Sequence, residues 1–205
     1  MSLPTVIARI AQIDEIVSPQ PPATSAPTGA DGFVSALAGV QHSSALGSTV
    51  AAPMLGAGTA GQRALTAAQA EVGVSEQPPG SNDGPRIAEY RAATSGSGVG
   101  PWCAYFTSWA AAQAGAPLGE VGQGFASVDA LYAWAQRTGR AIPAGQGVAP
   151  SPGDLVVWGG RHIGIVESVD PDGSIHTIEG NSSNAVSRRT YGPDGGGATG
   201  YVRLG

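Results

Sequence analysis

The spacing of apolar residues changes from a helical to a strand period along the second half of the chain. Between residues 63 and 139, apolar positions recur every three or four residues, as they do on one face of a helix. After a loop rich in Pro and Gly at 143–153, they recur every second residue, which is typical of strands. Helices followed by a run of antiparallel strands predict an α+β fold.

Local start and stop signals set the bounds of these elements. Pro85 and Pro101 suit the first turn of a helix, and Ser127 is a natural N-cap. The predicted helices are RALTAAQAEVG (63–73), GPRIAEYRAA (84–93), GPWCAYFTSWAAAQAG (100–115) and SVDALYAWAQRTG (127–139). The predicted strands are 154–158, 162–169, 174–180, 185–191 and 200–204, separated by turns rich in Gly, Asp and Asn.

The first 62 residues have a different character. Leu3, Val6, Ile10, Ile13 and Val17 lie on one stripe and predict an amphipathic helix over 1–17. Such a helix packs back on the rest of the protein or docks to a partner such as an export apparatus.

A low-complexity segment follows this helix. Residues 18–62 contain a single charge, Asp31, among Pro, Ala, Gly, Ser and Thr. Large side chains are needed to offset the entropy of ordering, so we expect a flexible linker with a short helix near 31–40. Of the twelve aromatic residues, only Phe33 precedes residue 90, so the folded domain is expected at 63–205.

Charge and composition exclude several classes of function. The net charge is −5, there is no Lys, and the ten Arg residues form no basic run, so nucleic-acid binding is not expected. No apolar run is long enough to span a bilayer. Charges at Arg9, Asp14 and Glu15 interrupt the first apolar stretch, which therefore does not resemble a signal peptide.

The few Cys and His residues argue against a metal site. A single cysteine excludes an internal disulfide and a multi-thiolate metal site. The three histidines are far apart and there is no HExxH motif, so no metal and no cofactor are expected.

Cys103 is the first candidate for chemistry. It lies in the first turn of its predicted helix, directly after the Gly-rich stretch SGSGVGP. A helix N-terminus stabilises a thiolate, which is the nucleophilic form of cysteine. The alternative is that Cys103 is a small buried hydrophobic residue.

His162 is the second candidate and begins a predicted strand. Alternation places His162, Gly164 and Val166 on one face of that strand, and Ile163, Ile165 and Val169 on the other. A histidine opposite an apolar face either lines a site or is an ordinary surface residue.

Glu179 and Asn181 are two positions apart near the end of the next strand, so both are expected on the same face. A carboxylate or amide in that position can hold an imidazole in the correct tautomer. His176 has the opposite parity and is not expected to be catalytic, and His42 lies in the linker.

The order Cys at a helix start, His at a strand start, and Glu-x-Asn at the end of the next strand resembles the CHAP amidohydrolase/peptidase family. Further similar stretches are WCAYFTSW, SPGDLVVWGGRHIGIVESV, the final GYVRL and the lead-in GVSEQPPGSNDGPRIAEYR. The resemblance runs from about Leu65 to Arg203. It implies a papain-like, NlpC/P60-like fold, with N-terminal helices packed on an antiparallel sheet and preceded here by a mostly flexible extension.

The resemblance also implies roles for individual residues. Cys103 would be the nucleophile, His162 its general base, Glu179 the residue that orients His162, and Asn181 an assisting residue. Many members carry Gln before the nucleophile, where this chain has Trp102, so the second donor of an oxyanion hole is open. Asn82 and Tyr90, together with Trp102, are the candidates for oxyanion or substrate contacts.

The function implied by the resemblance is a cysteine-dependent peptidoglycan hydrolase, either an amidase or an endopeptidase, that forms a thioester. The residues leave two alternatives open, an acyltransferase with the same Cys–His pair and a non-catalytic wall-binding or assembly module. We expect a monomer that acts at the cell wall outside the membrane. The export route is open between release through a pore, as for a phage lysin, and a flagellar-type export system.

Overall fold

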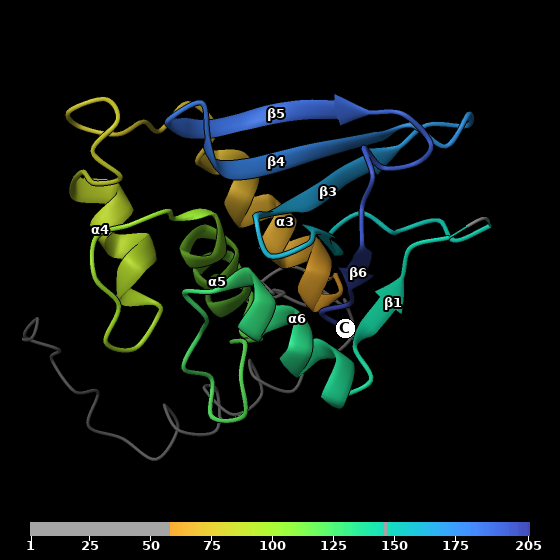
Figure 1. Ribbon diagram of the computed structural model, residues 1–205, viewed down its shortest axis with the longest axis horizontal. Coiled ribbons are helices and arrows are strands. Elements are labelled where there is room, and N and C mark those ends of the chain that lie inside the picture. The colour runs from red at the N-terminus through yellow and green to blue at the C-terminus, as the bar shows by residue number, and fades with distance from the viewer. Residues whose placement is uncertain (1–57, 146) are drawn as a thin grey trace, which may run out of the picture. The chain divides into compact units, whose positions relative to one another are not determined.

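The computed structural model describes residues 58–145 and 147–205 (Figure 1). Three predictions lie outside the described residues: the helix at 1–17, the short helix near 31–40 and the linker up to residue 57. The predicted docking of the first helix to an export partner therefore stays a prediction.

The four predicted helices are present. They are α3 (Ala60–Ala70), α4 (Pro85–Ala92), α5 (Cys103–Gln113) and α6 (Val128–Arg137). Ser127 caps α6 by accepting a bond from the main-chain N–H of Ala130, as predicted. Helix α5 begins three residues later than expected, at Cys103, and has no side-chain cap.

Helix α3 corrects the predicted end of the linker. It begins at Ala60 because Thr59 and Gln62 form a capping box, in which each side chain bonds the main chain of the other. The Arg63 side chain reaches back to the carbonyl oxygen of Gly58. Residues 58–62 therefore belong to the folded part and not to the linker, in which the sequence had placed them.

Six antiparallel strands form one sheet in the order β1-β6-β2-β3-β4-β5. Their bounds are β1 (Ala141–Pro143), β2 (Leu155–Trp158), β3 (His162–Val169), β4 (Ile175–Ser182), β5 (Ala185–Tyr191) and β6 (Gly200–Val202). The sequence predicted five of these strands and missed β1, which has three residues and reaches into the stretch read as a loop rich in Pro and Gly. The predicted α+β class is confirmed.

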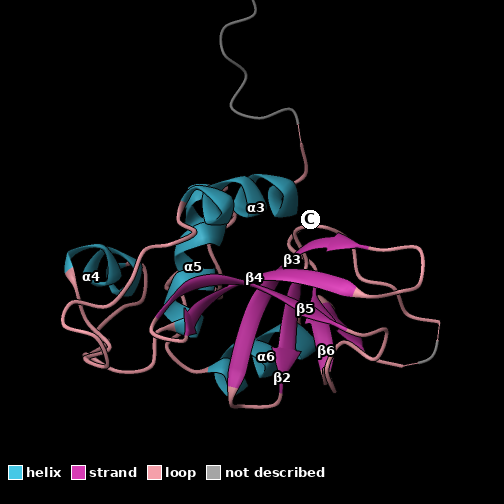
Figure 2. Cartoon of the chain, turned by 90° about the horizontal axis from the view of Figure 1, so that it is seen from above, coloured by secondary structure: helices cyan, strands magenta, loops and turns pink. Residues whose placement is uncertain are grey.

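The two faces of the sheet have different cover (Figure 2). Helices α3 and α5 pack on one face, where Leu155, Ile163 and Ile178 join the main core. The other face carries a smaller cluster that includes Val156, Trp158, Val166, Ile175 and Tyr201. His162 and Glu179 lie on this second face, where the His162 ring stacks on Trp158.

One side chain lies on the opposite face from the prediction. Val169 packs against the second cluster, with Val166, and not with Ile163 and Ile165. The reason is an irregularity between Val166 and Ser168, where the pairing of β3 with β4 shifts its register. An extra residue in one strand reverses the alternation beyond it.

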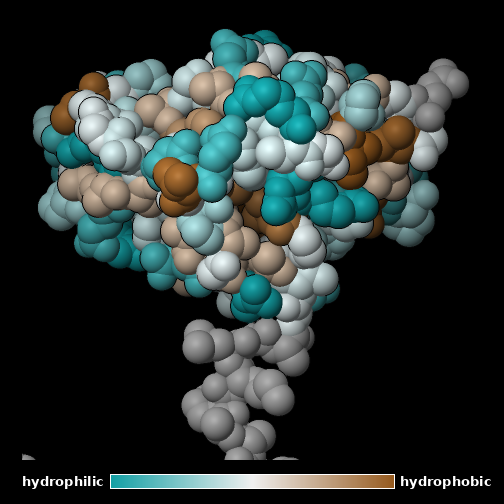
Figure 3. Space-filling model, turned by 90° about the horizontal axis from the view of Figure 1, so that it is seen from below, coloured by the Kyte–Doolittle hydropathy of each residue, from teal (hydrophilic) through white to brown (hydrophobic). Residues whose placement is uncertain are grey.

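On the face shown in Figure 3, hydrophobic residues form separate patches between hydrophilic ones. In the described part of the chain, Val99, Val121 and Val148 are the exposed large hydrophobic residues, and they come from three separate loops. No helix among the described residues has the length and apolar character that crossing a membrane requires.

Candidate active site

Cys103 is the first residue of α5. Its side chain belongs to the main core and is 5% exposed. The main-chain N–H groups in the first turn of a helix have no partner within the helix, and they favour a negative charge nearby. The loop before Cys103 is fixed by a bond from the Tyr105 hydroxyl to the carbonyl oxygen of Gly98, at 2.9 Å.

His162 is the first residue of β3 and is partly exposed, with 23% of its side chain accessible. It pairs across the sheet with Trp158, and the two rings stack with centroids 5.6 Å apart. The indole is fixed in turn, because Trp158 Nε1 donates to the carbonyl oxygen of Gly195 at 2.8 Å. The imidazole therefore rests against a rigid aromatic surface.

Glu179 is the partner of His162 on the neighbouring strand. Its Oε2 lies 2.8 Å from His162 Nε2, and the residue is 1% exposed. Its Oε1 accepts bonds from the hydroxyl groups of Thr177, at 2.7 Å, and Tyr191, at 2.9 Å. Gly164 provides the space, since a Cβ at that position would lie 2.7 Å from the Glu179 side chain.

These contacts set the protonation of the pair. Burial alone would lower the pKa of His162, but hydrogen bonds and charges from Cys103 and Glu179 outweigh it and raise the pKa to about 9. Burial would raise the pKa of Glu179, but the bonds from His162, Thr177 and Tyr191 lower it. At neutral pH the arrangement therefore favours an imidazolium beside a carboxylate, with Cys103 as the other hydrogen-bond partner of the ring.

Asn181 lies near Cys103, at a point where β4 no longer alternates regularly. Its φ is +58°, and the pairing of β4 with β5 shifts register between Glu179 and Ser182, so the alternation ends before it. With its amide oriented to satisfy both groups, Asn181 accepts a bond from the main-chain N–H of Trp102 at 3.2 Å and donates to Glu76 at 3.3 Å. It therefore holds the residue before Cys103, and no bond to His162 is found within the described residues.

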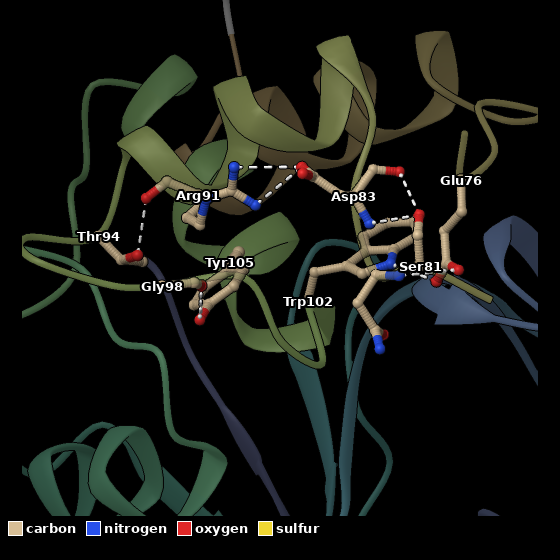
Figure 4. Close-up of polar contacts among 9 residues, drawn as sticks. Glu76, Ser81, Asp83, Arg91, Thr94, Gly98, Trp102 and Tyr105 are labelled. Carbon is tan, nitrogen blue, oxygen red and sulfur yellow. Dashed lines mark hydrogen bonds and ion pairs between the residues drawn. The ribbon is translucent and has the colours of Figure 1, made fainter. Parts of the chain in front are cut away.

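Glu76 is a site residue that the sequence did not suggest (Figure 4). It is 2% exposed, and its Oε1 accepts a bond from the indole N–H of Trp102 at 2.9 Å. Its Oε2 accepts from the main-chain N–H of Asn82 at 3.1 Å. Glu76, Trp102 and Asn181 thus form a closed network directly before Cys103.

The segment that carries Glu76 is tied to the sheet. The Glu76 main-chain N–H donates to the carbonyl oxygen of Asn184 at 2.9 Å, and the Val74 carbonyl oxygen accepts from the Val186 N–H at 2.8 Å, beside a bridge between Ser75 and Ala185. Farther along, Asp83 pairs with Arg91 at 3.1 Å, as Figure 4 shows, which fixes the end of this loop on α4. The lead-in segment is therefore a structural part of the site.

The three candidates for oxyanion or substrate contacts occupy different environments. Tyr90 and the Trp102 side chain are fully buried, and the Tyr90 hydroxyl donates to Glu71 at 2.6 Å. Burial and this bond hold the pKa of Tyr90 far above its usual range. We therefore assign both side chains to the core. Asn82 is partly exposed and has a φ of +55°.

His176 lies apart from this cluster. It bonds Asp170 at 2.8 Å and the Thr190 hydroxyl at 3.0 Å, and no bond to Glu179 occurs among the described residues. Over residues 58–145 and 147–205, no group of three or more His, Cys, Asp or Glu side chains is arranged to hold a metal ion.

Four contributors were missed by the sequence analysis: Glu76, Trp158, Thr177 and Tyr191. Thr177 could have been found, because it is two residues before Glu179 and therefore on its face. Trp158 and Tyr191 depend on strand pairing across the sheet, and Glu76 on a loop far away in sequence, so no local pattern indicated them.

Comparison with known proteins identifies part of the chain. No curated protein matches the sequence. A solved structure of the Resuscitation Promoting Factor Interacting protein RipA, in a mutated form, is similar at 18% identity and a TM-score of 0.41. The similarity covers 71% of this chain and 62% of that one, which is less than two thirds of its length. Residues 94–181, less than half of the chain, match the profile of the CHAP domain, the family that the sequence resembles.

Proposed function

We propose that this protein is a cysteine-dependent hydrolase that cleaves an amide bond of peptidoglycan peptides through a thioester. The observation that carries the proposal is the buried bond between His162 and Glu179, at 2.8 Å, with Cys103 at the N-terminus of α5 as the other charge partner of His162. A nucleophile, a base and a group that orients the base are the three parts of this chemistry.

In the first step, the Cys103 thiolate attacks the carbonyl carbon of the amide and forms a tetrahedral intermediate. The His162 imidazolium then gives its proton to the leaving nitrogen, the C–N bond breaks, and an amine and a thioester result. A His162 pKa of about 9 suits this role, because the ring then carries the proton that the amine needs at neutral pH.

In the second step, His162, now neutral, takes a proton from water. The resulting hydroxide adds to the thioester carbonyl, and the C–S bond breaks to give a carboxylic acid and the free enzyme. Glu179 holds the ring in one tautomer and stabilises its charge in both steps. Trp158 limits the rotation of the imidazole.

The oxyanion is bound in this proposal by the main-chain N–H of Cys103. Asn82 is our candidate for the second donor, because its main chain is held by Glu76, which also holds Trp102. Tyr90 and the side chain of Trp102 are not proposed for this role. A single oxyanion donor contributes about a hundredfold or more in kcat, so Asn82→Ala tests this assignment.

The choice between amidase and endopeptidase depends on the bond that is cleaved, and the same residues serve both. Mass spectrometry of fragments released from purified peptidoglycan identifies that bond. Cys103→Ala should release nothing, and acid quenching of the wild type should trap an acyl group on Cys103. If Cys103→Ala releases fragments as fast as the wild type, the proposed function is wrong.

If the thioester reacts with an added amine in place of water, so that a new amide is formed, the acyltransferase alternative applies. If the wild type binds peptidoglycan and releases no fragments, the non-catalytic alternative applies. In either case, we propose that the site of action is the cell wall outside the membrane.

A further inference from the structure

A cavity of about 360 Å³ opens beside the proposed base. Its lining consists of His162 and four neighbours, Trp158, Arg161, Tyr191 and Gly196. Because His162 is one wall of the cavity, a group bound here belongs to a residue flanking the cleaved amide.

Most polar groups around this cavity already have partners. Trp158 Nε1 donates to Gly195, the Tyr191 hydroxyl to Glu179, and the Gly196 N–H to Asp194 at 3.0 Å. His162 uses Nε2 for Glu179. None of these groups is left to recognise a charged ligand.

Arg161 is different. It lies in the exposed turn between β2 and β3, and in the described part of the chain its guanidinium forms no hydrogen bond and no ion pair. By contrast, Arg86, Arg91, Arg137, Arg188 and Arg203 each pair with a carboxylate. An unpaired guanidinium offers five N–H donors in a planar fork that matches a carboxylate.

The charges around the cavity favour an anion. Burial and Glu179 raise the pKa of Tyr191 to about 12, whereas the positive charges of Arg189 and Arg161 act in the opposite direction. Arg161 therefore lies close enough for its charge to act at the Tyr191 hydroxyl. Arg189 bonds the hydroxyl groups of Ser182 and Ser183, which leave its charge unneutralised.

One acidic side chain faces the same turn. Asp129 of α6 lies against Gly160, because a Cβ at Gly160 would overlap its carboxylate. Asp129 forms no ion pair with Arg161 within the described residues, so it reduces the positive potential of the turn without occupying the guanidinium.

We propose that this cavity is a specificity subsite in which Arg161 binds a free carboxylate on the residue flanking the cleaved amide, above the apolar surfaces of Trp158 and Tyr191. This inference rests on the proposed function and adds to it the chemical class of the substrate. The enzyme would distinguish a peptide with a free carboxyl group from the same peptide in which that group is amidated, because an amide lacks the charge and one of the two acceptors.

The test uses the full chain and two peptidoglycan peptides that differ only in whether the carboxyl group beside the cleaved bond is free or amidated. The wild type should prefer the free acid by about tenfold in kcat/KM, the size expected for a hydrogen bond to a charged group. Arg161→Gln should lose the preference through a higher KM for the free acid, with kcat nearly unchanged. Arg161→Lys should keep part of it, since the charge remains and the fork is lost.

Arg137→Gln is the matched control, because it removes the same charge from an exposed side chain on α6, outside the cavity lining. It should leave the preference unchanged. The subsite is wrong if the wild type cleaves both peptides equally well, or if Arg161→Gln keeps the preference. If the wild type cleaves neither peptide nor the wall itself, the proposed function fails, and with it the substrate class that rests on it.

Discussion

The two proposed reacting groups are held by two regions of very different construction. His162 is held within the sheet, by Glu179 on the next strand and by Trp158 across the pair. Cys103 is held mainly through a loop, because Glu76 on that loop, together with Asn181 at the end of β4, fixes Trp102 before it. The first support follows from strand alternation, whereas the second depends on a segment that precedes the matched CHAP region at 94–181.

This difference indicates how the two regions can vary. A support made by strand pairing is fixed by the same bonds that form the sheet, so its geometry is part of the fold. A support made by a loop can change without changing the sheet. We therefore expect the segment at 71–84 to determine how well Cys103 is positioned, and the sheet to determine the protonation of His162.

The largest effect is expected from removing the loop support entirely. A chain that begins at residue 94 lacks α3, α4 and Glu76, and with them the fully buried Ile87 and Tyr90. Each such side chain contributes about 1.5–3 kcal/mol, against a total stability of about 5–15 kcal/mol. We expect circular dichroism to show that this chain is unfolded, and an assay of cell-wall hydrolysis to show that it is inactive.

The control for that truncation is a chain that begins at residue 58. It keeps Thr59 and Gly58, which cap α3 and bind Arg63, and it should fold and keep its activity. A start at Gly61 would remove that cap. If the chain from residue 94 were folded and active, the lead-in would not be a support for the site.

The next largest effect is expected in the sheet. Glu179→Gln removes the negative charge that stabilises the His162 imidazolium, so the His162 pKa, about 9 in the wild type, should fall. Activity that needs protonated His162 is lost as the pH rises through this pKa, so the basic limb of the kcat/KM profile should move to lower pH. At neutral pH we expect a loss of about a hundredfold in kcat.

Thr177→Val is the matched variant for this prediction, since it removes one bond to Glu179 and keeps the charge. It should leave the basic limb close to its wild-type position, because the negative charge beside His162 remains. An unchanged basic limb in Glu179→Gln would contradict the role of Glu179 in setting the protonation of His162.

A smaller effect is expected from Glu76→Gln. The change keeps the size of the side chain but turns one acceptor into a donor, which then faces the N–H of Trp102 or of Asn82. Loss of one such bond costs about 1–3 kcal/mol. We expect kcat to fall about tenfold with KM and the pH profile unchanged.

The control for Glu76 is Arg91→Gln, which breaks the pair with Asp83 at the other end of the same loop. It should lower the melting temperature and leave kcat nearly unchanged. If Glu76→Gln shifts the basic limb as Glu179→Gln does, the two supports are not separate.

The same contrast explains what the sequence could predict. The strands at 162–169 and 185–191 were predicted with the observed bounds. The alternation of residues along the first of these strands also predicted which face of the sheet carries the His162 side chain. Parity failed where pairing shifts register, at Val169 and Asn181, since an irregularity in a ladder is set by the partner strand. Glu76 could not be predicted, because Trp102, the residue that it fixes before Cys103, is 26 residues away along the chain.

The smallest effect is expected for His176→Ala, and it tests the parity argument directly. Successive residues of a strand face opposite sides, so His176 lies on the other side of β4 from Thr177 and Glu179. It bonds Asp170 and Thr190 instead. Its replacement removes two exposed contacts, which are worth about 0–1 kcal/mol in stability, and touches no reacting group. We expect less than about a twofold change in kcat/KM, whereas His162→Ala should abolish turnover. Equal losses in the two variants would show that the side of β4 occupied by Glu179 does not determine which histidine is the base.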